Sequence, residues 1–156
     1  MGAMAHDPDR PRILPPIIAA LCLIGAGILQ AGLKAPRLLP PNWWWAGIFS
    51  VAAGLLVGGR SFVSFHQAGT PPDPRETPTA LVTTGMYAVT RNPMYMGMAL
   101  ILLGIALWRG DVVLLASPVA FVLIINTWQI PREERRLAAL FGAAYTAYRG
   151  RVRRWI

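Results

Sequence analysis

Residues 94–130 read MYMGMALILLGIALWRGDVVLLASPVAFVLIINTWQI and contain two apolar runs without charge. The runs, Met94–Trp108 and Val112–Ile130, are separated only by Arg109, Gly110 and Asp111. A helix needs roughly 20 apolar residues to cross a hydrocarbon core about 30 Å thick, and at about 1.5 Å per residue the first run covers about 22 Å. We therefore predict a helical hairpin with a tight turn, whose first helix is short for a membrane span.

Two further apolar runs precede the hairpin. Ile13–Leu33 carries no charge, and Trp43–Gly59 is uncharged and extends past Arg60 to Phe65. The chain of 156 residues is 54% hydrophobic and 14% charged, which differs from the charge-rich composition of a soluble domain. The sequence predicts an all-α integral membrane protein of about four transmembrane helices, followed by a C-terminal amphipathic cytoplasmic helix.

The basic residues are distributed unevenly over the predicted connections. Of the 15 lysines and arginines, 12 lie on the side that holds both termini and the second connection, and three lie on the other side. The positive-inside rule places both termini in the cytoplasm, and we expect the membrane to be a bacterial inner membrane. Directly after a transmembrane hairpin, the arginine-rich tail indicates attraction to anionic membrane lipids, and we expect no nucleic-acid partner.

The apolar runs and the proline-rich connection divide the chain into parts. Residues 1–12 are predicted to be a disordered N-terminus, and residues 13–68 to be an N-terminal transmembrane helix pair. Residues 69–79 contain four prolines among polar residues, which is typical of an irregular connection. Residues 69–156 are expected to form a second unit of loop, helical hairpin and C-terminal helix.

Glycines in the second and third runs indicate close helix packing. Gly54 and Gly58 lie one turn apart, and Gly97 and Gly104 lie two turns apart, as small residues do at membrane helix interfaces. The same pattern would permit a homodimer. Cys22 is the only cysteine, so no disulfide within the chain and no cysteine-based metal site is possible, and we expect no metal.

Polar residues gather where the third run begins. Pro93 suits the first turn of a helix, and Asn92 suits the capping position before it. Arg91 next to this helix start would be only a snorkelling side chain if nothing else lay near it. The free N–H groups of such a helix end also form a site for a carboxylate or another anion.

A second polar cluster follows the fourth run. Glu133 and Glu134 begin it, and apolar and aromatic residues then recur at helical spacing, which predicts one face of an amphipathic helix: Leu137, Phe141, Tyr145 and Tyr148. Because the third and fourth runs form a hairpin, Arg91 and Asn92 should lie beside the two glutamates. Such a group of charged, amide and aromatic side chains predicts a membrane-interface pocket for a polar ligand that meets a membrane-delivered partner.

Both clusters match a known pattern. The first reads Gly85-x-Tyr87-x-x-x-Arg91-Asn92-Pro93-x-Tyr95-x-Gly97, and the second, about 36 residues further on, reads Glu133-Glu134-x-x-Leu137-x-x-x-Phe141-Gly142-x-x-Tyr145-x-x-Tyr148. Together they resemble the isoprenylcysteine carboxyl methyltransferase and phospholipid methyltransferase superfamily over residues 77–156. The resemblance implies S-adenosylmethionine-dependent transfer of a methyl group to a lipophilic acceptor.

The resemblance also implies roles for individual residues. Cofactor binding falls to Tyr87, Arg91, Asn92, Pro93, Tyr95, Gly97, Glu133, Glu134 and Tyr145. A catalytic role near the acceptor falls to Glu133, Tyr148 and Arg149. Asn92 stands where eukaryotic carboxyl methyltransferases of the family carry histidine, and an amide cannot titrate near neutral pH.

Other readings of the sequence stay open. The acceptor can be a carboxylate, a thiol or an amine on a lipid or small lipophilic molecule. Because a sulfonium donor is already activated, a carboxylate acceptor would need no base, whereas the other two must lose a proton. A reductase-like relative is disfavoured because the chain is short and lacks a glycine-rich dinucleotide loop. A non-enzymatic membrane scaffold would explain the basic tail but not the convergence of the polar residues.

Overall fold

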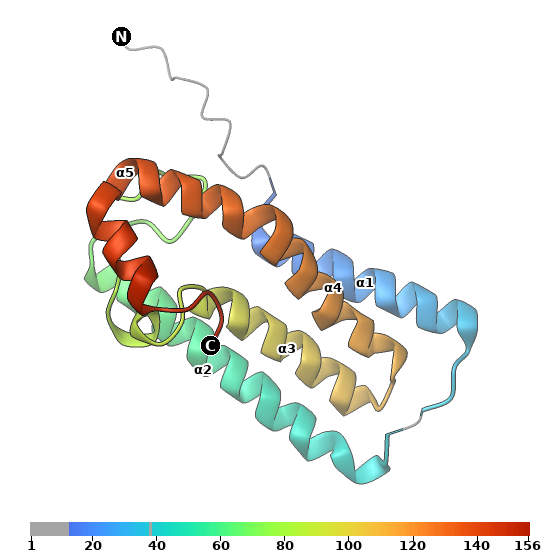
Figure 1. The fold of residues 1–156 in the computed structure, drawn as a ribbon. Coiled ribbons are helices and arrows are strands. Elements are labelled where there is room, and N and C mark those ends of the chain that lie inside the picture. Colours follow the sequence, from blue (N-terminus) through green and yellow to red (C-terminus); the bar gives the residue numbers. More distant parts are fainter. Residues whose placement is uncertain (1–12, 38) are drawn as a thin grey trace.

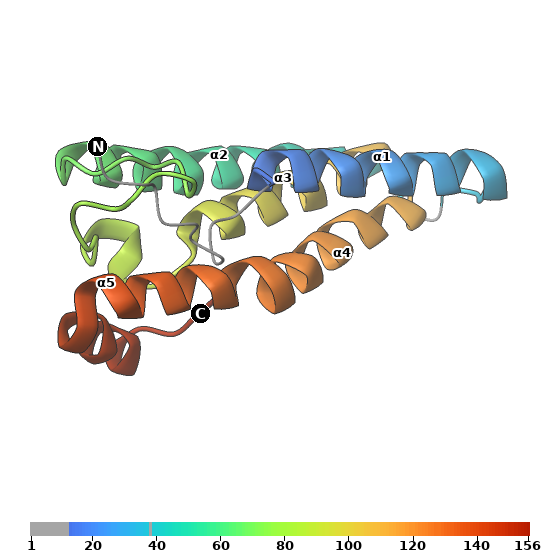
Figure 2. The same cartoon turned by 90° about the horizontal axis from the view of Figure 1, so that it is seen from above.

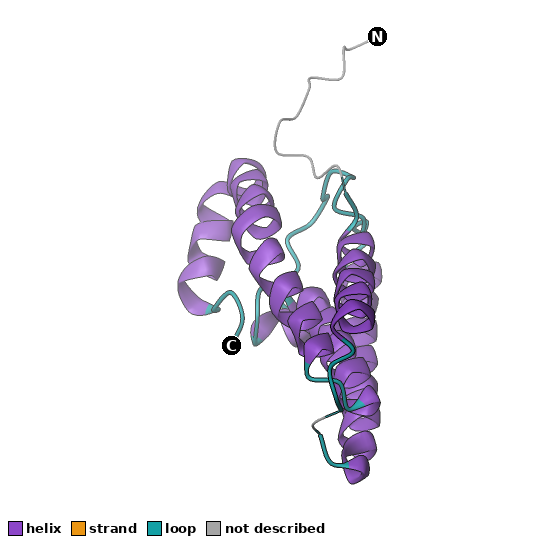
Figure 3. Ribbon diagram, turned by 90° about the vertical axis from the view of Figure 1, so that its right-hand side faces the viewer, coloured by secondary structure: helices purple, strands orange, loops and turns teal. Residues whose placement is uncertain are grey.

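A computed structural model describes residues 13–37 and 39–156; the predicted disordered segment 1–12 lies outside the described residues. In the described chain every regular element is a helix (Figure 3). The elements in chain order are α1 (Pro15–Leu33), η1 (Pro41–Trp43), α2 (Trp44–Gln67), η2 (Gly85–Ala88), α3 (Pro93–Arg109), η3 (Val113–Leu115), α4 (Ala116–Ile124), η4 (Ile125–Gln129) and α5 (Ile130–Arg151).

The long helices confirm the predicted membrane architecture. α1, α2 and the continuous run Val113–Arg151 are long and apolar enough to cross a membrane, and α3 is a shorter apolar helix. α1 and α3 run in one direction and α2 and α4 in the other (Figure 1). Large apolar side chains on the outer faces of α1 and α2 are exposed, as expected of surfaces that contact lipid.

The α3–α4 hairpin forms with the tight turn that the sequence predicts. Gly110 adopts φ 70°, a left-handed conformation that ends α3 and favours glycine. Asp111 follows it and is buried, with Gln30 Nε2 and Arg109 Nε each 3.5 Å from its carboxylate. This buried carboxylate links the end of α1 to the turn.

α2 and α3 pack through their glycines, which confirms the predicted close packing. A Cβ atom on Gly97 would lie 2.7 Å from the carbonyl oxygen of Gly54, and one on Gly104 would lie 2.6 Å from that of Gly47. Ser50 Oγ also donates a hydrogen bond of 2.8 Å to the carbonyl of Leu100 across this interface. The glycines therefore let the two backbones touch, and the predicted homodimer stays a prediction.

The fourth apolar run and the C-terminal amphipathic helix are joined in one continuous helical run. Instead of ending near Ile130, the helix continues through Pro131, the second residue of α5. The residues just before it, Ile125–Gln129, form a π-helical turn, a local widening that accommodates a proline without breaking the helix.

The helical geometry of α5 breaks at Gly142, eleven residues after Pro131. Its φ of 51° and ψ of −122° interrupt the helical geometry within α5, and only glycine adopts such angles without strain. The last turns of α5 are thereby redirected, and Phe141 does not share one straight helix face with Tyr145. Figure 2 shows α4 and α5 diverging from the other helices toward the end where α3 begins.

Adding a single methyl group tests the glycine contact. Gly104→Ala should lower the free energy of unfolding by about 1–3 kcal/mol, because the new Cβ meets backbone atoms that cannot move aside. Gly59→Ala, in the partner helix α2, has no heavy atom within 4 Å of its Cβ position and should be neutral or slightly stabilising. Thermal unfolding in detergent, followed by circular dichroism, measures both. Equal stability of the two variants would contradict the packing.

Candidate functional site

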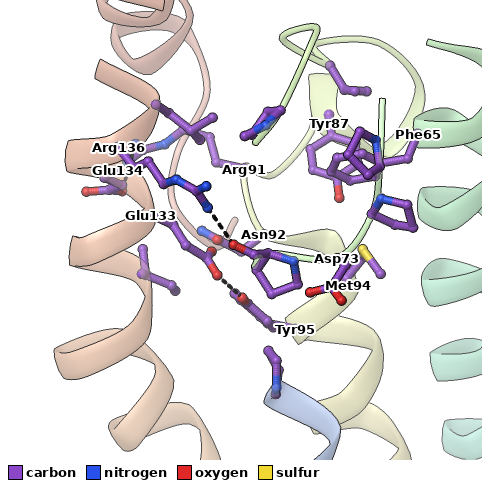
Figure 4. A pocket seen from close by; sticks show the side chains of 18 of the residues that line it. Phe65, Asp73, Tyr87, Arg91, Asn92, Met94, Tyr95, Glu133, Glu134 and Arg136 are labelled. Carbon is purple, nitrogen blue, oxygen red and sulfur yellow. Dashed lines mark hydrogen bonds and ion pairs between the residues drawn. The ribbon is translucent and has the colours of Figure 1, made fainter. Parts of the chain in front are cut away.

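A cavity of about 380 Å³ opens where α5 diverges from the start of α3 (Figure 4). Its volume lies within the roughly 300–1,000 Å³ range of small-molecule sites. The walls come from the first residues of α1, the end of α2, the loop between α2 and α3, the start of α3, and α5. All four tyrosines of the chain line it: Tyr87, Tyr95, Tyr145 and Tyr148.

The start of α3 is held differently from the sequence prediction. Pro93 does occupy the first turn, but the side chain of Asn92 makes no capping hydrogen bond. Its Nδ2 instead donates a hydrogen bond of 2.9 Å to the backbone carbonyl of Arg154. The hydroxyl of Thr90 is the acceptor for the Asn92 backbone N–H at 3.2 Å. The expected cap is therefore wrong, and the amide serves a contact between distant segments.

Arg91 and Glu134 form an ion pair, as expected from the hairpin. Arg91 Nη1 lies 2.8 Å from Glu134 Oε1, and the two side chains are only 11% and 12% exposed. Arg154 binds the same carboxylate in bidentate geometry, with Nε 3.1 Å from Oε1 and Nη2 2.7 Å from Oε2. The hydrogen bond to Glu134 is the main cause that raises the pKa of Arg154. Both oxygens of Glu134 are thus occupied.

Glu133, the residue before Glu134, has a different environment. Its Oε1 accepts hydrogen bonds from the hydroxyl of Tyr95 at 2.5 Å and from Nε2 of Gln129 at 2.9 Å. Gln129 is buried in the π-helical turn, so the turn itself orients the carboxylate. Among the described residues, Oε2 of Glu133 makes no hydrogen bond, so one oxygen of this wall residue can still accept a hydrogen bond.

The other tyrosines shape the remaining wall. Arg91 Nη1 donates to the hydroxyl of Tyr145 at 3.3 Å, and the hydroxyl of Tyr148 donates to the backbone carbonyl of Tyr87 at 2.7 Å. The ring of Tyr87 packs edge-on against Phe65, with 5.4 Å between centroids. Burial is the main cause that raises the pKa of Tyr87, so this phenol stays protonated at neutral pH.

The cavity has a polar side and an apolar side. Figure 4 shows Glu133 and Arg91 toward α5, and Tyr87 and Phe65 toward α2. The charged and amide lining residues are Asp73, Arg91, Asn92, Glu133, Glu134 and Arg136. The apolar lining residues from the helices are Pro15, Pro16, Phe62, Phe65, Met94, Met98, Ile130 and Leu137, with Leu14 just before α1.

Most of the predicted site residues converge on this cavity. Those in its lining are Tyr87, Arg91, Asn92, Tyr95, Glu133, Glu134, Tyr145 and Tyr148. Three others lie outside the lining. Pro93 is buried in the first turn of α3, Gly97 faces α2 through its contact with Gly54, and Arg149 is exposed on α5. The described residues contain no group of His, Cys, Asp and Glu that could hold a metal.

The sequence analysis missed two groups of site residues. The C-terminal segment after α5 returns to the start of α3, and Arg154 joins the ion pair there (Figure 1). The first residues of α1 and the end of α2 complete the apolar side. No periodicity marks either group.

Comparisons with known proteins give consistent results. The family model described as phospholipid methyltransferase matches residues 43–144. An uncharacterized protein of Haemophilus influenzae is 43% identical over 63 residues, which is 40% of this chain and the whole of that protein. Protein-S-isoprenylcysteine O-methyltransferase B of Arabidopsis thaliana is 28% identical over 152 residues, covering 87% of this chain and 68% of the plant protein. No solved structure matches the chain.

The contact between Tyr148 and Tyr87 can be tested by removing one hydroxyl. Tyr148→Phe keeps the ring but leaves the carbonyl of Tyr87 without its donor, so the free energy of unfolding should fall by about 0.5–1.5 kcal/mol. Thermal or denaturant unfolding in detergent measures the change. Wild-type stability would show that the hydroxyl does not hold the segment before α3 in place.

Proposed function

The chain belongs to the phospholipid methyltransferase family, and we propose that it transfers a methyl group from S-adenosylmethionine to a lipophilic acceptor delivered by the membrane. The observation that carries this proposal is the two-sided cavity at the start of α3, in which paired charges face an apolar wall. A polar cofactor and a lipophilic acceptor need such a shared space, because methyl transfer requires the reacting groups to be held together and aligned.

The polar side of the cavity fits the cofactor's amino-acid part. Arg91 Nε is buried without a hydrogen-bond partner, and Glu133 Oε2 makes no hydrogen bond among the described residues. Buried polar groups are almost always satisfied, so the unpartnered Arg91 Nε favours a ligand that brings a carboxylate, and the free oxygen of Glu133 can accept a hydrogen bond from an ammonium or hydroxyl group. We assign Arg91 to the cofactor carboxylate and Glu133 to its ammonium or ribose hydroxyls.

The remaining predicted residues take supporting roles in this proposal. Glu134 acts through Arg91, because both of its oxygens already bind arginines. Tyr95 orients Glu133, and Tyr148 fixes the wall through the backbone of Tyr87. Arg149 has no direct role in the chemistry, since its side chain is exposed outside the cavity.

The apolar side supports an acceptor with a lipophilic body. Phe62 and Phe65 of α2 line the cavity, as do Pro15 and Pro16 at the start of α1. The N-terminal helix pair therefore contributes to the site, and residues 69–156 carry the groups for the cofactor. The plant relative is named for transfer to isoprenylcysteine; for this chain we propose the broader class of membrane-delivered carboxylates, thiols or amines.

Bound S-adenosylmethionine supplies a sulfonium-activated methyl group, so the protein needs little acid–base chemistry. The residues of the cavity bind and orient the two partners and exclude water. Both oxygens of Glu134 already bind arginines, which leaves Glu133 as the candidate base of the pair. An acceptor that arrives already deprotonated suits this arrangement best.

We further propose that the cavity faces the cytoplasm of a bacterium, with the chain in the inner membrane and both termini cytoplasmic. The excess of arginines at this end supports that orientation. A non-catalytic scaffold with a lipid-binding tail would account for the exposed arginines, but it would leave the unpartnered Arg91 Nε and the two-sided cavity without a purpose.

Binding of the cofactor product tests the proposal. S-adenosylhomocysteine should bind the detergent-purified protein saturably in a calorimetric titration, and Glu133→Gln should weaken it by about tenfold or more by removing the charge that faces the ammonium. Glu76→Gln, a matched change at an exposed loop carboxylate, should leave the affinity unchanged. Absence of binding to well-folded wild-type protein would contradict the proposal.

A second substitution tests the assignment of the polar side of the cavity to the cofactor and of the apolar side to the acceptor. Ala80→Phe places a ring in the loop wall and should block acceptor turnover while S-adenosylhomocysteine affinity stays within about twofold, because Ala80 lines the cavity from the loop after α2, whereas Glu133 lies on α5. Ala68→Phe adds the same ring at an exposed position outside the lining and serves as the control. Loss of cofactor affinity with intact turnover would reverse the assignment of the two sides.

A further inference from the structure

The chain end returns to the site through its backbone. The carbonyl of Arg153 accepts a hydrogen bond of 3.0 Å from the backbone N–H of Arg91. The carbonyl of Arg154 accepts two more, from the hydroxyl of the fully buried Thr90 at 3.1 Å and from Nδ2 of Asn92 at 2.9 Å. The C-terminal strap, residues 152–156, is thus bound to the segment that carries Arg91.

Two side chains of the strap bind Asn126, in the π-helical turn between α4 and α5. Nη1 of Arg154 and Nε1 of Trp155 donate to the same oxygen, Oδ1 of Asn126, at 3.2 Å and 3.1 Å. Asn126 lies in the π-helical turn, and the indole of Trp155 packs against the buried core cluster that includes Phe121 and Tyr95. Arg154 therefore connects the π-helical turn, α5 and the start of α3.

Arg154 differs from its neighbours in the basic tail. Arg149, Arg151 and Arg153 have exposed side chains, as expected for residues that face anionic lipid. The guanidinium of Arg154 instead turns inward onto Glu134, whose other partner is Arg91. Glu134 is nearly buried, so its position depends on both cations being present.

We propose that Arg154 is a positioning residue of the methyl-transfer site: it fixes Glu134, and through Glu134 the guanidinium of Arg91 that faces the cofactor carboxylate. This inference rests on the proposed function. Arg154 lines no part of the cavity, so it acts only through the carboxylate that it shares with Arg91. Asn92 supports the same arrangement by anchoring the strap carbonyl, which gives this amide a role that requires no proton transfer.

Neighbouring arginines of the strap supply a matched pair of variants. Arg154→Ala should raise the dissociation constant of S-adenosylhomocysteine by about tenfold, because Glu134 then relaxes and Arg91 loses its fixed orientation. Arg153→Ala removes the same charge one residue earlier, where only the backbone carbonyl is used, and should change the affinity by less than about twofold. Equal effects of the two variants would reduce Arg154 to a surface charge and overturn the inference.

A double-mutant cycle separates positioning from a general loss of stability. In a Glu134→Gln background the bidentate ion pair is already gone, so adding Arg154→Ala should weaken binding by less than about twofold further. A tenfold effect that persists in this background would show that Arg154 acts by another route, and would contradict the inference.

A milder variant keeps the inference testable if Arg154→Ala does not fold. Arg154→Lys retains the charge but cannot form two parallel hydrogen bonds, so binding should weaken by about threefold or more with a normal circular dichroism spectrum. Wild-type affinity of the folded lysine variant would overturn the inference. Absence of binding by the wild-type chain would overturn the proposed function and this inference with it, whereas tight binding by Arg154→Ala overturns the inference alone.

Discussion

Glu134 is a nearly buried carboxylate that two arginines from distant parts of the chain must neutralise. A buried charge without a partner is far less stable than one in water, so Arg91, Arg154 and Glu134 have to meet in the folded protein. Meeting this requirement brings the residues before α3, the first turns of α5 and the C-terminal strap to one place. One wall of the cavity follows from this arrangement, because Arg91 and Glu134 both line it and are paired there.

The helices supply a rigid frame around this ion cluster. Glycine contacts hold α2 and α3 backbone to backbone, while α4 and α5 diverge from them. The π-helical turn lets one helix pass through Pro131 and continue out of the apolar region, and Gly142 then redirects it. A family of methyltransferases that act on membrane-delivered substrates requires such an opening, since the polar and apolar partners approach from different surroundings.

The sequence predicted the hairpin and the pairing of Arg91 with Glu134, because a three-residue turn leaves the far ends of two helices no choice but to be neighbours. It did not predict the return of the strap. An arginine in a basic tail looks the same whether it contacts lipid or a carboxylate, so Arg154 carried no signal of its own. It also did not predict the π-helical turn before Pro131, because that turn depends on tertiary contacts that local propensity does not contain.

Transfer of a labelled methyl group tests the central claim most directly. Purified protein in vesicles made from a bacterial lipid extract would be incubated with S-adenosylmethionine that carries tritium in its methyl group. If the cavity joins the cofactor to a membrane-delivered acceptor, label should accumulate in the organic extract only when the folded protein is present. Label that stays entirely in the aqueous phase, with protein that is folded and binds S-adenosylhomocysteine, would contradict a membrane-delivered acceptor in that extract.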